Sequence, residues 1–244
     1  LRRGAAGVIV SDRSVIETCG EELKDFFVII VRDTTRALQR LARYVRRRSD
    51  SCVVAITGSM GKTTTKEMAA SLLEGTYRVF RSAGNLNNHI GVPLSLLELR
   101  KRPQVAVMEL GMNHAGEISD LVAITEPDIR VWTNVAEVHS AFFNSIEEIA
   151  DAKAEILEGA SSTGSLIANA GDFRVMNRSK SFPGSVTTFG VGQSADVSAL
   201  QVRMLGLEGM EASIETPVGS RLLRTLMVGL GHMDNIVAAI ALAL

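Results

Sequence analysis

The sequence predicts an α/β fold in which a mostly parallel sheet is flanked by helices. Three short apolar runs, at residues 53–56, 105–108 and 129–132, lack the polar alternation of half-buried strands. Continuous runs of this kind are typical of strands that are buried on both faces. Helical patterns lie between them at 62–73 and 116–124. Strands that alternate with helices form a parallel sheet covered by helices.

The composition is close to that of an average globular protein. Hydrophobic residues make up 46% and charged residues 22% of the 244 residues. The formal net charge of -1 gives no overall attraction to nucleic acid or to an anionic membrane, so an anionic substrate needs a local site. No apolar run reaches the ~18 residues that span a bilayer, and no signal peptide is visible. Two distant cysteines, Cys19 and Cys52, are expected to be reduced thiols of a cytoplasmic protein.

Residues 1–48 are predicted to be a partial N-terminal α/β domain. Two apolar runs, at 7–10 and 26–31, indicate strands, and apolar residues at helical spacing indicate a helix at about 35–48. A polar Ser-Asp-Ser stretch follows this helix. We therefore place a domain boundary there and assign 49–244 to a second, central domain.

Three consecutive arginines, Arg46 to Arg48, end the predicted helix. They could form a nucleic-acid patch, but positive charges also suit the negative end of a helix dipole. We favour a solvated helix end over a nucleic-acid site.

The last third of the sequence predicts a small β-rich subsection. A short apolar run lies at 165–168, and beyond Ser185 apolar and polar residues alternate between glycine- and proline-containing turns. The chain opens without methionine and closes inside an apolar segment. We expect it to be a fragment of a longer protein.

A phosphate-binding loop follows the first buried strand. Residues 57–65 read Thr-Gly-Ser-Met-Gly-Lys-Thr-Thr-Thr, between a strand and a helix. Glycines let backbone N–H groups face a phosphate, while Lys62 supplies a mobile positive charge and Thr63 a hydroxyl for Mg²⁺. The loop is shorter than the general G-x-x-x-x-G-K-[ST] pattern. The predicted nucleotide-binding residues are Thr57, Gly58, Ser59, Met60, Gly61, Lys62, Thr63 and Thr64.

The loop alone does not separate kinases, GTPases and ligases, but four further segments do. An amide-rich stretch, Gly-Asn-Leu-Asn-Asn-His-Ile-Gly-Val-Pro, occupies 84–93. Glu-Leu-Gly-Met-Asn-His at 109–114 puts an acid at the end of a buried strand, where open α/β sheets place their sites. Thr-Asn-Val-Ala-Glu-Val-His at 133–139 and Ala-Lys-Ala-Glu-Ile at 152–156 follow. In this order the segments closely resemble the Mur ligase family.

The resemblance covers essentially the whole chain. It implies that 1–48 end a domain that binds the UDP substrate and that 49–244 form a central ATP-binding domain, with the family's C-terminal domain lacking. It also implies a cytoplasmic, monomeric, ATP-dependent ligase of peptidoglycan precursor synthesis. The reaction would join D-alanyl-D-alanine to UDP-N-acetylmuramoyl-tripeptide through an acyl phosphate, with no role for nucleic acid or membrane insertion. We expect little turnover from this chain alone.

The resemblance assigns metal and catalytic roles to five residues. Thr63 and Glu109 match positions that hold a first Mg²⁺, and both offer oxygen ligands to a hard cation. His139 and Lys153 match positions that hold a second. Lys153 corresponds to a lysine that is carbamylated by CO₂, which converts an ammonium into an anionic ligand. Lys62, Lys153 and His139 form the predicted catalytic set.

Three asparagines complete the predicted site. Asn87 and Asn88 are expected to contact substrate or metal-bound water, or else to satisfy backbone groups of their own loop. Asn235 is expected on the adenine side, although the segment His232-Met-Asp-Asn is one residue shorter than the family pattern. Two alternatives remain open: an ATP- and Mg²⁺-binding module without ligase activity, and a related ligase with another acceptor.

Overall fold

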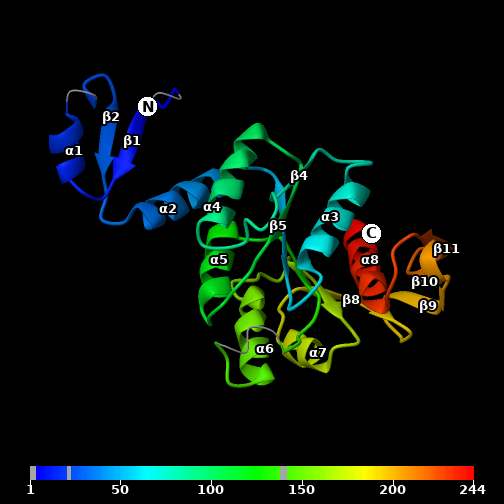
Figure 1. Ribbon diagram of the computed structural model, residues 1–244. Coiled ribbons are helices and arrows are strands. Elements are labelled where there is room, and N and C mark those ends of the chain that lie inside the picture. Colours follow the sequence, from blue (N-terminus) through cyan, green and yellow to red (C-terminus); the bar gives the residue numbers. More distant parts are fainter. Residues whose placement is uncertain (1–3, 21–22, 138–141) are drawn as a thin grey trace.

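The computed structural model describes residues 4–20, 23–137 and 142–244. The main feature of this described part is one nine-stranded sheet with the order β11-β10-β9-β8-β7-β6-β3-β5-β4 (Figure 1). Strands β3 to β9 pair in parallel with one another, whereas β10 pairs antiparallel with both β9 and β11. The strands are β3 (Cys52–Thr57), β4 (Val79–Arg81), β5 (Val105–Glu109), β6 (Ile129–Trp132), β7 (Ser165–Asn169), β8 (Ser185–Val191), β9 (Val197–Met204), β10 (Met210–Thr216) and β11 (Gly219–Thr225).

Helices cover both faces of this sheet. The buried residues of β3 alternate between two apolar clusters: Val53 and Ala55 join the cluster of α4, α5, α6 and α7, whereas Val54 and Ile56 join that of α3 and α8. The continuous apolar runs therefore belong to strands buried on both faces, as predicted. The helices are α3 (Lys62–Leu73), α4 (Gly91–Leu96), α5 (Glu117–Thr125), α6 (Ile146–Ala154), α7 (Phe173–Ser179) and α8 (Leu230–Ala243).

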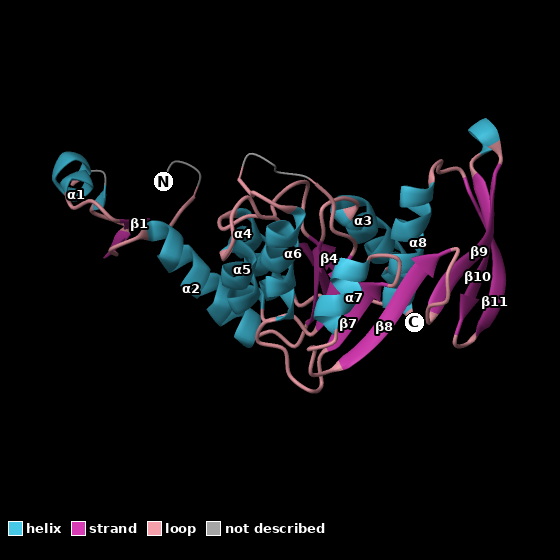
Figure 2. Ribbon diagram, turned by 90° about the horizontal axis from the view of Figure 1, so that it is seen from below, coloured by secondary structure: helices cyan, strands magenta, loops and turns pink. Residues whose placement is uncertain are grey.

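The β-rich part beyond Ser185 is continuous with the main sheet. Strands β8 and β9 extend the parallel sheet, and Phe189, Val197 and Ala199 are buried in the cluster that contains α8. Strand β10 runs opposite to the parallel strands and β11 reverses again, and these two strands end the sheet at its edge. Figure 2 shows this edge at the opposite end of the molecule from the N-terminal part.

The N-terminal part contains a two-stranded parallel sheet of β1 (Gly7–Val10) and β2 (Phe27–Ile30), with α1 (Ser14–Cys19) between them. Helix α2 (Thr34–Arg47) is capped at its N-terminus by Asp33, whose side chain accepts a hydrogen bond from Arg36 N. It joins this small sheet to the main body and packs against α4 and α5 (Figure 1). Within the described residues, no helix is both long and apolar enough to cross a membrane.

The three arginines at the end of α2 differ in exposure: the predicted solvated helix end holds for Arg47 and Arg48, which are exposed, and is wrong for Arg46. The Arg46 side chain, only 11% exposed, lies 2.8 Å from Asp128. It also donates to the backbone oxygens of Thr125 and Glu126, at 2.8 and 2.7 Å. Arg47 pairs with the Glu126 carboxylate at 2.7 Å. These partners lie about 80 residues further along the chain, beyond the reach of a local helix pattern.

Candidate nucleotide and metal site

The phosphate loop lies at the carboxyl end of β3 and leads directly into α3, as predicted. Two of its glycines have positive φ, 152° at Gly58 and 82° at Gly61. A Cβ atom at Gly58 would lie 1.9 Å from Thr133 Oγ1, and one at Gly61 would lie 2.1 Å from Asn235 Oδ1. Both the backbone conformation and the close neighbours therefore require glycine at these positions.

The loop is held in shape by the segment that follows β6. Met60 N donates to Asn134 Oδ1 at 2.9 Å, and Thr133 Oγ1 donates to Met60 O at 2.8 Å. The hydroxyl of Ser59 donates to Ala136 O at 3.0 Å and accepts from Ala136 N at 2.8 Å. This side of the loop is therefore held by contacts within the protein itself.

Lys62 folds back over its own loop. Its Nζ donates to Gly58 O at 2.9 Å. Burial lowers the pKa of Lys62, and the negative charge of Glu109 opposes this shift. A carbonyl is a weaker partner for an ammonium than a phosphate, since hydrogen bonds between ionised groups are the stronger ones. The loop thus holds a cation close to the space that phosphates occupy in such folds.

Glu109 is the centre of a second cluster beside this lysine. It is the last residue of β5, it is buried, and each of its two carboxylate oxygens accepts a hydrogen bond. Thr63 Oγ1 donates to Glu109 Oε2 at 2.7 Å, and Asn87 Nδ2 donates to Glu109 Oε1 at 2.8 Å. The structure therefore brings together three residues from α3, β5 and the amide-rich segment that are distant in the sequence.

These oxygens suit Mg²⁺ better than a metal that needs a full protein cage. Among the described residues no group of three or more His, Cys, Asp or Glu side chains could hold a metal ion. Mg²⁺ is usually held by one or two carboxylates together with phosphate oxygens and water. The hydroxyl of Thr63 and the carboxylate of Glu109, 2.7 Å apart, therefore fit a Mg²⁺ that arrives with a nucleotide.

Lys153 is a buried cation next to the phosphate loop. It lies on α6 and is 2% exposed. Burial, and then the positive charge of Lys62, lower the pKa of Lys153 to about 7. Within the described part of the chain its ammonium has no hydrogen-bond or ion-pair partner. A lysine in this state is a candidate functional group, because strongly shifted pKa values gather at functional sites.

Helix α6 is fixed at its C-terminal end, close to Lys153. Glu155 accepts hydrogen bonds from Gly116 N at 2.6 Å and from Ser119 N at 3.0 Å. These N–H groups lie at the start of α5, where a carboxylate also suits the positive end of the helix dipole. Glu155, two residues after Lys153, thus anchors α6 to α5.

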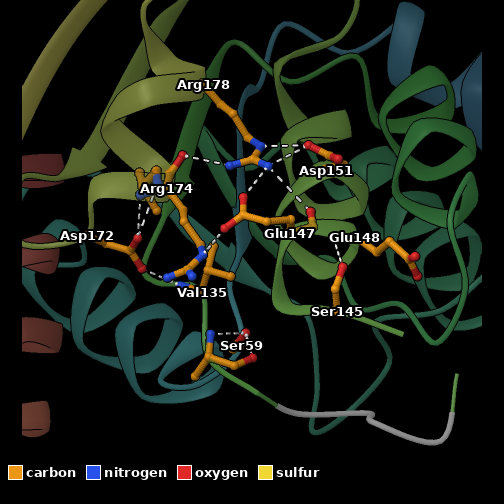
Figure 3. Close-up of polar contacts among 11 residues, drawn as sticks. Ser59, Val135, Ser145, Glu147, Glu148, Asp151, Asp172, Arg174 and Arg178 are labelled. Atoms are coloured by element: carbon orange, nitrogen blue, oxygen red, sulfur yellow. Dashed lines mark hydrogen bonds and ion pairs between the residues drawn. The ribbon is translucent and has the colours of Figure 1, made fainter. Parts of the chain in front are cut away.

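A second set of contacts joins α6 to α7 (Figure 3). Arg174 pairs with Glu147 at 2.6 Å, and Arg178 reaches both Glu147 and Asp151, at 2.9 and 2.6 Å. Asp172 caps α7 and also accepts from Val135 N at 2.6 Å. The helix that carries Lys153 is therefore connected through α7 to the segment that shapes the phosphate loop.

Two of the predicted site residues, Asn88 and Asn235, form hydrogen bonds with the protein itself. Asn88 Oδ1 accepts from Ile90 N and Gly91 N, at 3.1 and 2.9 Å, and so caps α4. Asn235 lies against Gly61, and its Oδ1 accepts from Thr65 Oγ1 at 3.3 Å.

Others of the predicted set differ in exposure. Thr57 is buried, and its hydroxyl donates to Leu110 O. Met60 is exposed. Thr64 lines an apolar hollow between α3, α8 and β11. His139 lies outside the described residues.

The sequence reasoning missed three charged residues around the site. They are Lys66, whose Nζ donates to Ser82 O at 2.6 Å, Asp172, which caps α7, and Asp234, which lines a hollow of about 510 Å³ beside Asn134 and Asn169. Burial raises the pKa of Asp234 to about 6. Asp172 could have been predicted from the sequence, because it comes shortly after a buried parallel strand. Lys66 could not, because in the sequence it resembles any other lysine of a helix.

Comparisons with known proteins agree with this arrangement. The family model of the Mur ligase middle domain matches residues 56–243. The UDP-N-acetylmuramoyl-tripeptide–D-alanyl-D-alanine ligase of Escherichia coli is 38% identical over 219 residues, which cover 88% of this chain and 48% of that protein. The crystal structure of MurF from Acinetobacter baumannii superposes with a TM-score of 0.84 at 36% identity, covering 89% of this chain and 48% of that one.

A MurF ligase from Thermotoga maritima, solved in complex with ADP, superposes with a TM-score of 0.82 at 27% identity and covers 98% of this chain and 54% of that one. The chain thus spans about half of the length of these relatives. The family model covers well over half of the chain. The chain belongs to the Mur ligase family.

Proposed function

We propose that this chain is the nucleotide-binding central part of an ATP-dependent ligase that adds D-alanyl-D-alanine to UDP-N-acetylmuramoyl-tripeptide. The observation that carries the proposal is the meeting of Thr63, Glu109 and Asn87 beside Lys62 at the carboxyl edge of the sheet. The relatives named for this activity match the chain across that same region.

The reaction requires negative charges to be gathered and stabilised. Lys62, which donates to the Gly58 carbonyl, would pair with the β and γ phosphates of ATP, and the backbone N–H groups at the start of α3 would bind the same phosphates. Thr63 and Glu109 would hold Mg²⁺, which would neutralise charge on the phosphate oxygens when bound. The γ-phosphoryl group passes to the tripeptide carboxylate and ADP leaves. The amine of D-alanyl-D-alanine then attacks the acyl carbon, releasing inorganic phosphate and a proton.

Lys153 is proposed to be carbamylated. Its neutral amine attacks CO₂, forms a carbamate and releases a proton. The carbamate places a negative charge beside the positive charge of Lys62. Burial and the like charge of Lys62 both favour the neutral amine, and the ammonium has no counter-charge in the described part of the chain. The carbamate and His139 are proposed to hold a second Mg²⁺.

We also propose a cytoplasmic, monomeric enzyme of peptidoglycan precursor synthesis, and so of cell-wall formation, cell shape and division. Its substrates are a UDP-linked sugar peptide and a dipeptide, both water-soluble molecules. The hollow lined by Asn134, Asn169 and Asp234 is proposed for the nucleoside end of ATP.

The decisive experiment is phosphate release by the full-length protein with ATP, Mg²⁺ and UDP-N-acetylmuramoyl-tripeptide. We expect release to depend on D-alanyl-D-alanine and not on single amino acids. The isolated 244-residue chain is expected to turn over little. Release that is independent of any acceptor would support an ATP- and Mg²⁺-binding module instead, and release with another acceptor would support a related ligase.

A further inference from the structure

Lys66 is a buried lysine that the proposed reaction does not use. It lies on α3, three residues after Thr63, and is 0% exposed. Its Nζ donates to Ser82 O at 2.6 Å and to Gly84 O at 3.2 Å, and lies 3.2 Å from Glu67 Oε1. An ammonium has three donors, so each of its protons has an acceptor. A buried charge is retained only with such partners, because desolvation is costly.

We define the amide loop as residues 83–91. Gly84 lies at the start of this loop, and Ser82 is the residue directly before it. Ser82 continues the ladder between β4 and β5, since Ser82 N donates to Val107 O at 3.0 Å. Its hydroxyl accepts from Glu109 N at 3.3 Å. Lys66 therefore holds the point at which the backbone leaves the sheet, next to the metal-binding carboxylate.

The far side of the amide loop returns to the same carboxylate. Asn87 Nδ2 donates to Glu109 Oε1 at 2.8 Å, and Asn87 O accepts from Gly111 N at 2.8 Å. Helix α3 thus meets Glu109 by two routes. One is direct, through Thr63, and the other runs from Lys66 through the amide loop to Asn87.

We propose that Lys66 is a positioning residue, which fixes the amide loop on α3 so that Asn87 orients the Glu109 carboxylate toward the metal. The proposal rests on the proposed function for its metal-nucleotide site. An apolar side chain of similar length would fill the space but would leave the Ser82 and Gly84 carbonyls without their donor. Partners that orient a metal ligand change metal affinity by about 10- to 100-fold when removed.

The test is Lys66→Met in the full-length protein, with Arg81→Met as the matched control. Arg81 also pairs with Glu67, at 3.3 Å, but it pairs in addition with Glu74 and donates to no carbonyl of the amide loop among the described residues. We expect Lys66→Met to raise the Mg²⁺ concentration for half-maximal binding of an ATP analogue about tenfold. Backbone hydrogen exchange in residues 85–91 should rise in the ligand-free protein. Arg81→Met should change neither quantity.

The route through Asn87 is tested by a double-mutant cycle. If Lys66 acts through the amide loop, Lys66→Met should add little to the loss of Mg²⁺ affinity already caused by Asn87→Ala. Additive losses would overturn the proposal, as would unchanged exchange of the loop in a folded Lys66→Met protein. If that variant does not fold, Lys66→Gln, which keeps one donor group, should show the same changes at smaller size, and no change in it would overturn the proposal.

These readouts do not depend on ligase turnover. A wild-type protein that binds Mg²⁺ and nucleotide but releases no phosphate would refute the proposed function, while the exchange and binding changes would still support the role of Lys66. An active wild type whose Lys66→Met variant binds and exchanges normally would refute the role of Lys66 alone.

Discussion

Two buried cations of this protein, Arg130 and Lys153, have the same exposure and opposite surroundings. Both are 2% exposed, and burial lowers the pKa of each. Arg130, near the start of β6, donates to the backbone oxygens of Ile156, Pro127 and Glu158, at 2.8, 2.8 and 3.2 Å. Lys153 has no such partner among the described residues, and burial, followed by the like charge of Lys62, lowers its pKa.

This difference in hydrogen-bond partners distinguishes a cation that stabilises the fold from one that serves the proposed reaction. A guanidinium that satisfies three buried carbonyls joins the segments that carry them, so its removal should weaken the fold. An ammonium without a partner only destabilises the fold, so its presence needs another explanation, and the adjacent phosphate loop provides one. The following predictions test this separation.

The largest effect on activity is expected for Lys62→Ala. The variant loses the positive charge that faces the phosphates, and a single such contact typically accounts for about 10²- to 10³-fold in kcat. Steady-state phosphate release with the full-length protein measures it. Circular dichroism should show an unchanged fold, and a fully active folded variant would contradict the assigned role.

Arg130→Met is expected to reduce the free energy of unfolding by about 3 kcal/mol, because three buried carbonyl oxygens lose their donors. Urea unfolding gives this value. The kcat per folded molecule should stay at the wild-type value. A large loss of kcat in folded protein would mean that Arg130 also serves the site.

Lys153→Met is expected to show the reverse pattern. Its kcat should fall about 10- to 100-fold, as for loss of a group that supports a metal. Its free energy of unfolding should stay the same or rise, because a poorly solvated cation is replaced by an apolar side chain of similar length. A Lys153→Met protein that is less stable but keeps the wild-type kcat would contradict the distinction between Lys153 and Arg130.

The smallest effect is a dependence of stability on pH. The pKa of Lys153 is about 7 in the folded protein and 10.5 for an ordinary lysine. Between these values the unfolded chain binds the proton and the folded protein does not, so stability should rise with pH, by about 1 kcal/mol per unit. Below about pH 7 the contribution is constant. Urea unfolding of wild type and Lys153→Met between pH 7 and 9 should differ by this slope, and parallel curves would contradict it.

Local patterns predicted the elements that carry the site. The strand at 129–132 and the helix at 62–73 agree with the bounds of β6 and α3, and the strand at 53–56 lengthens by one residue at each end. These elements are long or strongly apolar, and their turn contains glycines with required positive φ. The short helices α4 and α7 were missed, because six or seven residues carry too little periodicity.

The contacts that a local pattern could not predict are those between distant residues. Arg46 meets Asp128, 82 positions along the chain, and Asn87 meets Glu109 across 22 positions. Asn88 is used as a cap for α4, which is the alternative of loop backbone contacts weighed above. The burial of Lys66 and Lys153 depends on which face of each helix meets the sheet, so residue type alone did not reveal it.

The pKa of the Lys153 amine, in protein that is free of ligands and of CO₂, is the most direct test of this account. Heteronuclear NMR of protein labelled with ¹³C and ¹⁵N in lysine, with the Lys153 signal assigned from the Lys153→Met variant, would follow its titration. The account predicts a midpoint at about pH 7, set by burial and by the charge of Lys62. A midpoint near the ordinary lysine value of 10.5 would show that the ammonium is well stabilised and would contradict the account.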